Sequence, residues 1–503
     1  MPLLNSTTFD VPGVYVSEQS FGVIPASLAS HSTVYMLGFS NKSGAPQNTP
    51  YFIQSPADFF NVFGASASAN SVQLFFDQRS GSGIYFVNVP VKATQTVAIA
   101  SVTVGTTYTL TVDSFAVSYT AVTGDTTATV TAALAAKVNT QLSYIAYMVG
   151  SVIKTSATVT GSAGITLTPS AAPAYPTIQD VIACINTAFD PEMRQGFLIA
   201  PEFFQTFTNQ SDRVSLALAM EAQCADPLFN WVAVADCGQA IATATTGGGA
   251  INLAIAERNN LSSAKGHLVY YFPYWYNASS QLVPPSASVV GVALRRYRAE
   301  GYRQPPAGTQ YPVYGVADTS IPLTDKLQSQ LNPVGINCCR KLPMGKGTVI
   351  WGARTVSSSP FYRFMTVRVI MNVLSGTLNK AFNDVVFSSV DGLGVLYSRI
   401  HQTAVSICER LRLAGALYGA TPEDAYLVVC DETNNPAIDL EQGIVSVDVI
   451  VKPSPILEVL SVRLSRAALG AVFAEVQASG DTGSINYIGS RESLGSVSSP
   501  KTP

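Results

Sequence analysis

The residues that most often do chemistry in proteins are few in this chain and stand far apart. Its three histidines are His31, His267 and His401, and none belongs to an HExxH motif or to a His/Cys spacing that binds zinc. No GxSxG motif, which places a nucleophilic serine on a sharp turn, is present. A Gly-Lys-Gly-Thr run resembles the end of a phosphate-binding loop, but Arg340 replaces its first glycine and Gly347 its serine or threonine. These patterns predict no catalytic, cofactor or metal site.

Thiols, carboxylates and aromatic side chains give no better candidate. The seven cysteines are scattered and form no CxxC pair, so we expect reduced thiols that fill the core. Cys338 and Cys339 are adjacent and could be redox-active, but we favour a strand with one thiol on each face. The acidic pair Asp431-Glu432 lies beside turn residues, where a solvated loop explains it. The aromatic run at 270–276 lacks a basic groove and indicates a core strand or a subunit contact.

Composition points instead to a chain whose surface is covered by partners. Asp, Glu, Lys and Arg make up 12% of the 503 residues, against roughly 25% in an average soluble domain. The net charge of −3 gives no electrostatic reason to bind nucleic acid, which needs clustered Lys and Arg. Every apolar stretch is soon interrupted, so we expect no membrane insertion. The N-terminus lacks a basic segment followed by an apolar one, so we expect folding in a cytoplasm.

Predicted strands and helices alternate over residues 29–91 and again over 173–332. The helix expected near 177–189 begins with Thr177, and Asp180 follows three residues later, as in a capping box. Alternation of this kind indicates a sheet with helices on its faces. We therefore predict one discontinuous α/β domain formed by these two parts of the chain.

The segment between these two parts, residues 92–172, has a different composition. It is dominated by Thr, Ser, Ala, Val and Gly, with alternating stretches at 107–122 and 157–169 and an Ala-rich helix at 127–142. A disordered linker would not show this regularity. We predict a small β-rich module inserted into the α/β domain.

Residues 333–466 predict an α+β domain with two long helices, over 361–382 and 393–413, followed by strands. One face of the second helix carries Leu393, Leu396, Ile400, Ala404, Ile407 and Leu411, and the other carries Arg399, Gln402, Ser406 and Arg410. Residues 444–452 alternate as a strand with one apolar side. With an extended N-terminal arm over 1–28 and a C-terminal tail over 467–503, the fold class is α/β and α+β multidomain.

Several runs resemble the tail sheath family of contractile phages and related injection systems. GINCCRKLPMGKGTVIWGARTVS at 335–357 resembles a Gly-Ile-Asn strand, a short loop and the family's Trp-Gly-Ala-Arg-Thr signature. VPPSASVVGVALRRYRAEGYRQPPAG at 283–308 resembles its Pro-Pro-Ser helix, and VPGVYVSE at 11–18 its N-terminal arm. Cys430-Asp431, Asn435-Pro436 and the run at 444–466 resemble its end. Within the insertion, residues 119–136 resemble a small β module common in phage virion proteins.

This resemblance implies a structural subunit of a contractile sheath, with no enzyme activity and no cofactor. Copies of the chain would polymerise helically around a tail tube and contract to drive the tube through the target cell envelope. The implied partners are other copies, the tube protein, and the baseplate and tail terminator proteins. The implied location is the virion tail, after assembly in the host cytoplasm.

The resemblance also implies that terminal arms exchange strands between neighbouring subunits, because unpaired strand edges accept an added strand. The candidate strand-exchange residues are Val14, Tyr15, Val16, Leu457, Val459, Val462 and Leu464. The polar side of the helix over 393–413 is a candidate tube-facing surface, with Arg399, Arg410 and Arg412. A merely solvated helix face explains that polar side equally well.

Two alternatives remain at this point. A phage adhesin or fibre would account for the Ser/Thr-rich module and the aromatic residues, and it predicts receptor binding in place of polymerisation. The sheath of a host-encoded extracellular contractile injection system would share every motif described above. An enzyme would need a catalytic constellation that the sequence does not contain.

Overall fold

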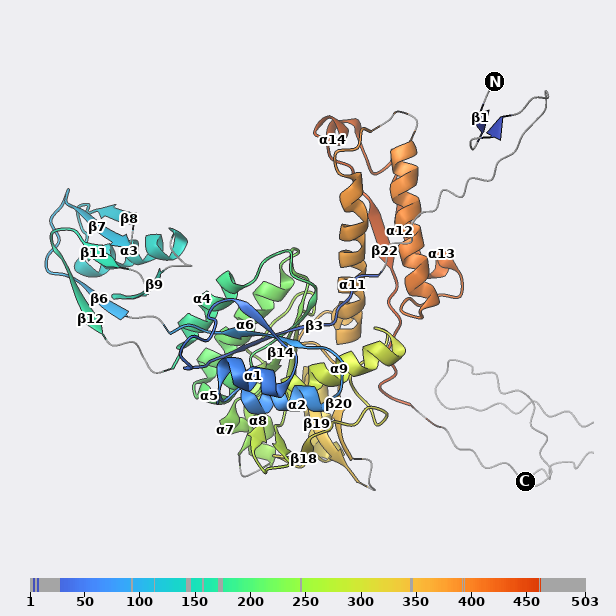
Figure 1. The fold of residues 1–503 in the computed structure, drawn as a ribbon, viewed down its shortest axis with the longest axis horizontal. Coiled ribbons are helices and arrows are strands. Elements are labelled where there is room, and N and C mark those ends of the chain that lie inside the picture. The colour runs from blue at the N-terminus through green and yellow to red at the C-terminus, as the bar shows by residue number, and fades with distance from the viewer. Residues whose placement is uncertain are drawn as a thin grey trace, which may run out of the picture. The chain divides into compact units, whose positions relative to one another are not determined.

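The computed structural model describes most of the chain (Figure 1). It covers residues 3–4, 7–8, 28–460 and 462, apart from 92–93, 113, 142–145, 156–157, 171–174, 245–246, 344–346, 391 and 393. The two units that it separates by internal contacts are 1–455 and 456–503. We describe each of them by itself.

An eight-stranded sheet forms the centre of the first unit, in the order β20-β19-β15-β14-β13-β3-β5-β4. Its strands are β3 (Thr33–Gly38), β4 (Pro50–Ile53), β5 (Ile84–Asn88), β13 (Gly196–Ile199), β14 (Val232–Asp236), β15 (Leu268–Phe272), β19 (Ile336–Leu342) and β20 (Gly347–Trp351). The inner pairs are parallel, whereas β4 and β20 pair antiparallel at the two edges. A parallel sheet covered on both faces explains why its strands are continuously apolar, as in the fully buried β3.

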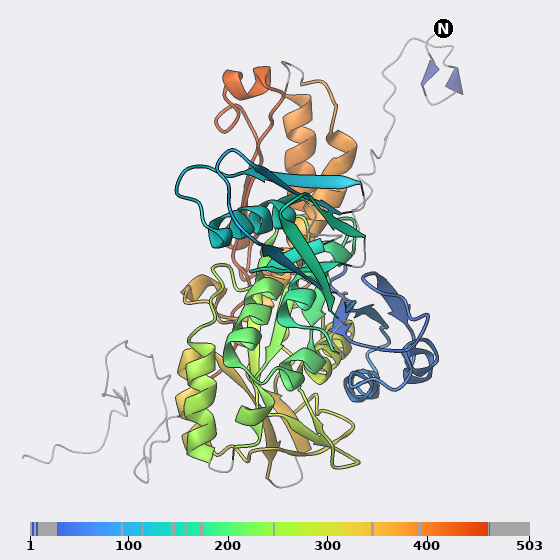
Figure 2. The same ribbon diagram turned by 90° about the vertical axis from the view of Figure 1, so that its left-hand side faces the viewer.

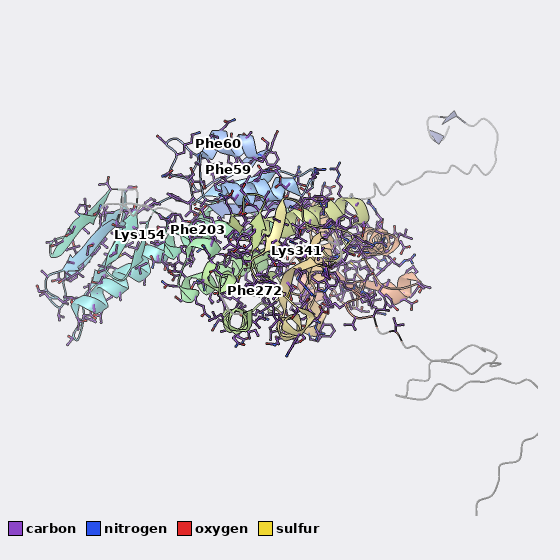
Figure 3. The ribbon with its side chains drawn as sticks, turned by 90° about the horizontal axis from the view of Figure 1, so that it is seen from below. Phe59, Phe60, Lys154, Phe203, Phe272 and Lys341 are labelled. Atoms are coloured by element: carbon purple, nitrogen blue, oxygen red, sulfur yellow. The ribbon has the colours of Figure 1, made fainter. Side chains whose placement is uncertain are left out.

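Helices cover both faces of this sheet and divide the core into two layers. Val34 and Met36 of β3 belong to the layer that includes α1 (Pro56–Phe63), α2 (Ala69–Asp77) and α9 (Ser286–Glu300). The opposite layer includes residues of α4 (Ile178–Ala188), α5 (Pro201–Thr206), α6 (Gln210–Ala225), α7 (Gln239–Ala242), α8 (Gly247–Arg258) and α10 (Asp325–Leu331). Figure 3 labels Phe59 and Phe60 on α1; Phe59 is buried against the sheet and Phe60 is exposed.

The α/β domain predicted from the sequence is thus a mixed sheet with helices on both faces, but it extends further along the chain than expected. Strands β19 and β20 fall in the predicted 333–466 domain, yet β19 pairs with β15 and lengthens the sheet. The sheet therefore crosses the predicted boundary at residue 333. The physical reason is that Ile336, Cys338 and Cys339 are buried apolar residues that need a neighbour on each face.

The inserted segment forms its own small core. Its elements are β6 (Thr94–Ile99), β7 (Thr107–Val112), β8 (Phe115–Thr120), α3 (Thr127–Gln141), β9 (Ala146–Val149), β10 (Val152–Thr155), β11 (Val159–Gly161) and β12 (Ile165–Ser170). They make two sheets, of order β12-β6-β10-β9 and β11-β7-β8, and bury Leu110, Val130 and Leu134. All of these elements lie between residues 92 and 172. Lys154, labelled in Figure 3, forms an ion pair of 3.2 Å with Asp180 at the start of α4.

The C-terminal part of the first unit consists of two long helices and a small sheet. These are α11 (Met365–Phe382), α12 (Val395–Leu413), α13 (Pro422–Ala425), α14 (Ala437–Glu441), β21 (Tyr426–Val429) and β22 (Asp448–Val451). Val369 of α11 and Ile407 of α12 belong to the same core layer as α9. The C-terminal helices therefore share one core layer with the α/β part, and Leu396, Tyr397, Ile400 and Cys430 form a small cluster of their own.

The remaining elements are short. They are β1 (Leu3–Leu4), β2 (Thr7–Thr8), β16 (Trp275–Asn277), β17 (Leu282–Val283), β18 (Val316–Thr319) and the 3₁₀ turns Asn332–Val334, Pro360–Tyr362 and Asn383–Val385. None of the helices in the described part of the chain is long and apolar enough to cross a membrane.

Candidate functional site

The helices α11 and α12 lie side by side, as Figures 1 and 2 both show. The helix predicted over 393–413 is found as α12, and its predicted apolar face is buried at Leu396, Ile400, Ala404, Ile407 and Leu411. Leu393 lies outside the described residues. The apolar stripe thus fixes which side of α12 faces away from the core.

The three arginines predicted to face the tube differ in their surroundings. Arg399 is exposed, whereas Arg410 and Arg412 are half-buried. Arg412 forms an ion pair of 2.6 Å with Glu409 and donates to the Ala420 carbonyl oxygen at 2.9 Å. This arrangement gives Arg412 a role inside the subunit, because it connects α12 to the segment before β21. Arg399 is the most accessible of the three, and its contact with a tube stays a prediction.

The strands β21 and β22 form an isolated antiparallel pair, and each has only one strand neighbour among the described residues. Val428 is buried on the side that packs against the helices. On the other side, Leu427 and Ile450 lie directly opposite each other and are 55% and 59% exposed. A two-stranded sheet is marginal alone and its open edges can accept a further strand. This small sheet therefore combines open edges with an exposed apolar pair.

The terminal segment predicted to exchange strands is exposed where it is described. Leu457, Val459 and Val462 in the second unit are all largely exposed, and residues 456–460 form no strand within the chain. Leu464 and the N-terminal candidates Val14, Tyr15 and Val16 lie outside the described residues. Their role in strand exchange stays a prediction. The observed exposure of apolar side chains is what a segment that docks on another chain requires.

Sequence reasoning missed one exposed apolar turn between α11 and α12. Val386 is 60% exposed and Phe387 is completely exposed with a positive φ of 69°. Left-handed backbone is unfavourable for an aromatic residue. The signal that could have revealed this turn is the apolar run Val385–Phe387 next to Asp384, between two predicted helices.

One cavity in the C-terminal part brings a histidine, a thiol and a carboxylate together. This cavity of about 590 Å³ is lined by Tyr397, His401, Cys430, Asp431 and other residues of this region. Burial raises the pKa of the Cys430 thiol, which disfavours the thiolate that a nucleophile needs. A hydrogen bond from the Thr433 hydroxyl lowers the pKa of Asp431, so this carboxylate stays ionised and is no proton donor at neutral pH.

The two buried histidines make contacts inside the subunit. Burial lowers the pKa of His31 to about 3 and that of His267 to about 4, so both rings are neutral at pH 7. His31 lies edge-on to Phe197, and its Nε2 is 3.1 Å from Nδ2 of Asn372 on α11. No group of three His, Cys, Asp or Glu residues within the described ranges could hold a metal ion.

The comparisons with known proteins give a sequence relative and structural neighbours. No protein-family model matches the chain. Over 229 residues, 44% of this chain and 33% of the relative, it is 23% identical to the tail sheath protein of Vibrio phage KVP40. The chain thus spans about a third of the length of this curated relative.

Two solved structures match nearly the whole fold. The sheath of the extracellular contractile injection system PVC, in its contracted state, has a TM-score of 0.58 at 18% identity and covers 92% of this chain and 99% of its own. The chain has the contractile sheath fold. The contracted helical sheath of the anti-feeding prophage matches equally well, with a TM-score of 0.58, 18% identity, and 92% of this chain and 100% of its own covered.

The sheath fold and the sheath relative confirm the resemblance predicted from the motifs at 283–308 and 335–357. They do not favour the adhesin alternative, because both kinds of comparison point to sheath proteins. The sequence relative is named a tail sheath protein, and both solved structures are contracted sheaths.

Proposed function

We propose that this chain is the sheath subunit of a contractile tail or injection system. Copies polymerise helically around a tail tube, and contraction of the lattice drives the tube through the envelope of the target cell. The observation that carries this proposal is the sheath fold over 92% of the chain, combined with the sequence similarity to a phage tail sheath protein. The relative belongs to a phage and the structural neighbours belong to injection systems, so both settings remain open.

The small sheet of β21 and β22 supports polymerisation by strand addition. Its open edges and the exposed pair Leu427 and Ile450 offer backbone and apolar partners to one strand of a neighbour. The segment that contains Leu457, Val459, Val462 and Leu464, and the arm that contains Val14–Val16, are the proposed donors. Such contacts join two different surfaces, so the assembly grows as an open helix.

Contraction needs no nucleotide in this proposal. A lattice of extended subunits that is metastable releases free energy when the contracted lattice buries more surface. An additional 200 Å² of apolar surface per subunit, taken as an example, releases roughly 5 kcal/mol at about 25 cal/mol/Å². Strand-exchanged arms keep neighbours connected while the bodies move. Each subunit is held by several weak contacts at once, which together make a strong attachment.

The partners are the tube protein inside the lattice and the baseplate and tail terminator proteins at its ends. In the phage setting, the assembled protein lies in the virion tail, after assembly in the host cytoplasm. The exposed Arg399 on α12 is the proposed tube contact, with Arg410 about three turns further along the polar side of the helix. A polar contact holds the tube and can release it during contraction, whereas an apolar contact would resist this release.

Electron microscopy of the recombinant protein at high concentration, with and without tube protein, tests this function. We expect striated tubes from the full chain and none from variants that lack residues 1–20 or 455–503. Compact particles from the full chain in the presence of tube protein would contradict the proposal. Tubes that persist in both truncated variants would retain the sheath function and overturn strand exchange by the terminal arms.

A further inference from the structure

The helix α9 and the loops beside it gather arginines on one surface of the α/β part. Residues 286–304 contain four arginines and one acidic residue, Glu300. The helices α2 and α9 lie side by side in Figure 1, and Arg79 follows α2 directly. Arg79 and Arg298 are both exposed, and Arg295 is half-buried. We call Arg79, Arg295 and Arg298 the arginine cluster.

The arginine cluster is held in place by an aromatic ring. The guanidinium of Arg295 lies 4.3 Å from the centre of the Tyr314 ring, and that of Arg79 lies 5.7 Å from the same centre. Gln78 anchors the backbone of Tyr314, since its Nε2 donates to the Tyr314 carbonyl at 2.8 Å and its Oε1 accepts from the Tyr314 N–H at 3.0 Å. The two cations are thus positioned before any partner arrives, which lowers the entropy cost of binding.

The positive charges of the cluster have no counterion in the described chain. None of Arg79, Arg295 and Arg298 forms an ion pair with a described carboxylate. Burial lowers the pKa of Arg295, and the nearby charge of Arg79 lowers it further. Two like charges on one ring repel each other, so an anionic partner would relieve an unfavourable interaction that folding leaves in place.

A depression next to the cluster adds an apolar floor. It has a volume of about 410 Å³ and is lined by Phe52, Phe76, Arg79, Gly81 and neighbouring residues. The Arg298 guanidinium lies directly against Gly81, so the rim of the depression is basic. Phe52 belongs to the edge strand β4 and is 42% exposed. An apolar floor inside a basic rim fits a segment that combines an apolar side chain with carboxylates.

The C-terminal part of the chain contains such a segment. Residues 413–451 include seven acidic residues and no Lys, Arg or His. On and around α14, Glu432 and Glu441 are exposed, and Ile438 is 63% exposed between them in sequence. Neither glutamate forms an ion pair with a described base. We call residues 431–444 the acidic segment.

The two surfaces cannot meet within one copy, because α12 separates them. Leu440 and Val445 pack against Leu396 at the start of α12. Arg303, shortly after α9, lies against Gly415 just beyond the end of α12. The 19 residues of α12 correspond to about 28 Å along the helix axis.

We propose that the arginine cluster and its depression bind the acidic segment of a second copy of this chain. Glu432 and Glu441 pair with Arg79 and Arg298, and Ile438 covers the aromatic floor of Phe52 and Phe76. The contact joins two different surfaces, so it propagates along a row of subunits. This inference rests on the proposed polymerisation and names one contact that is separate from the exchange of terminal arms.

Charge reversal tests the contact. The variants R79E/R298E and E432R/E441R change exposed residues, so each should keep the circular dichroism spectrum of the wild type. We expect each to raise the critical concentration for tube formation in sedimentation at least tenfold, and the four-residue variant to restore most of the loss. Equal critical concentrations in all four proteins would overturn the contact while the sheath function stands. Wild-type protein that forms no tubes even with tube protein would contradict the sheath function itself.

A disulfide gives a second readout that does not depend on tube yield. All seven native cysteines are buried, so they contribute little background to oxidation in the folded protein. Ser82 lines the depression and Gln442 is an exposed neighbour of Glu441. The variant S82C/Q442C should give a ladder of linked chains on a non-reducing gel of oxidised assemblies, and each single variant at most dimers. A variant that assembles without forming a ladder would overturn the proposed pairing.

Discussion

Asp236 shows how a single buried carboxyl can make the stability of this fold depend on pH. It lies at the end of β14 and accepts hydrogen bonds from the backbone N–H and the hydroxyl of Ser286 at the start of α9. Burial raises the pKa of Asp236 to about 7, although these two hydrogen bonds lower it in part. The folded chain therefore binds this proton more tightly than the unfolded chain, whose carboxyl titrates near 3.9. The contribution of Asp236 to stability falls as the pH rises from about 4 to about 7 and is constant above.

The variant D236N should remove this dependence. An asparagine can accept from the Ser286 N–H and donate to the Ser286 hydroxyl, and it does not titrate. We expect the free energy of unfolding of D236N, relative to wild type, to increase by about 2–3 kcal/mol between pH 5 and pH 8. Urea unfolding at both pH values measures it. The exposed Asp384 supplies the control D384N, whose difference from wild type should change little, and an equally flat D236N would contradict the assignment.

The role of a residue was predictable where residues a few positions away along the chain determine it. Cys338 and Cys339 lie on opposite faces of β19 because a strand alternates its side chains, and Asp180 accepts from the Thr177 N–H at 2.8 Å because three residues separate them. The buried ion pair of Arg213 with Glu257 could not be found this way. Its members stand 44 positions apart on α6 and α8, and only the folded arrangement of these two helices brings the Arg213 Nε within 2.8 Å of the carboxylate.

At the scale of elements, the small sheet of β21 and β22 leads to a prediction that separates tube assembly from the stability of the subunit. Leu427 and Ile450 are directly opposite and exposed, so L427E/I450K replaces an apolar pair by an ion pair and keeps the strand pairing. We expect the stability of the isolated subunit to change by less than about 1 kcal/mol. Tube formation, in contrast, should be lost because the docking surface becomes charged.

Thermal unfolding of the samples measures the stability of the subunit, and electron microscopy of the same samples measures tube formation. The control is V104E, which changes an exposed apolar residue of the inserted module. That variant should form tubes like the wild type. Normal tubes from L427E/I450K would mean that this face of the sheet lies outside the lattice, and a lower melting temperature would mean that the pair supports the fold.

Long elements with a strong pattern were predictable, whereas the partner of a strand in the sheet was not. The helix α12 begins two residues from its predicted start and ends where predicted, because its apolar residues recur every three or four positions. Strands β19 and β20 join the central sheet because β15, which precedes β19 by more than 60 residues, offers it an unpaired edge. Residues 456–460 form no strand in the single chain. An extended apolar segment becomes a strand only when another strand satisfies its backbone groups.

At the scale of the whole molecule, the inserted module is attached in a way that makes it removable. Its first and last strands, β6 and β12, are antiparallel neighbours, and Thr94 lies opposite Ser170. Paired residues in such a ladder are about 5 Å apart. The chain therefore leaves the α/β part and returns to it at nearly the same place. The module also has its own core of Leu110, Val130, Leu134 and other residues. The sequence predicted this insertion because its composition changes on both sides.

These facts predict that the module folds by itself and takes no part in the contacts between neighbouring subunits of the lattice. Replacing residues 92–172 by a Gly-Ser-Gly linker should leave a folded subunit, since the module has a core of its own. The replacement removes the contacts of Lys154 with Asp180 and Thr177. The shortened chain should still form tubes with tube protein, with the same axial repeat in electron micrographs. The separate module should unfold in one cooperative transition. If the shortened subunit is folded but forms no tubes, the module is part of the contacts between neighbours. The point variant K154M isolates the cost of the lost ion pair and should form tubes in either case.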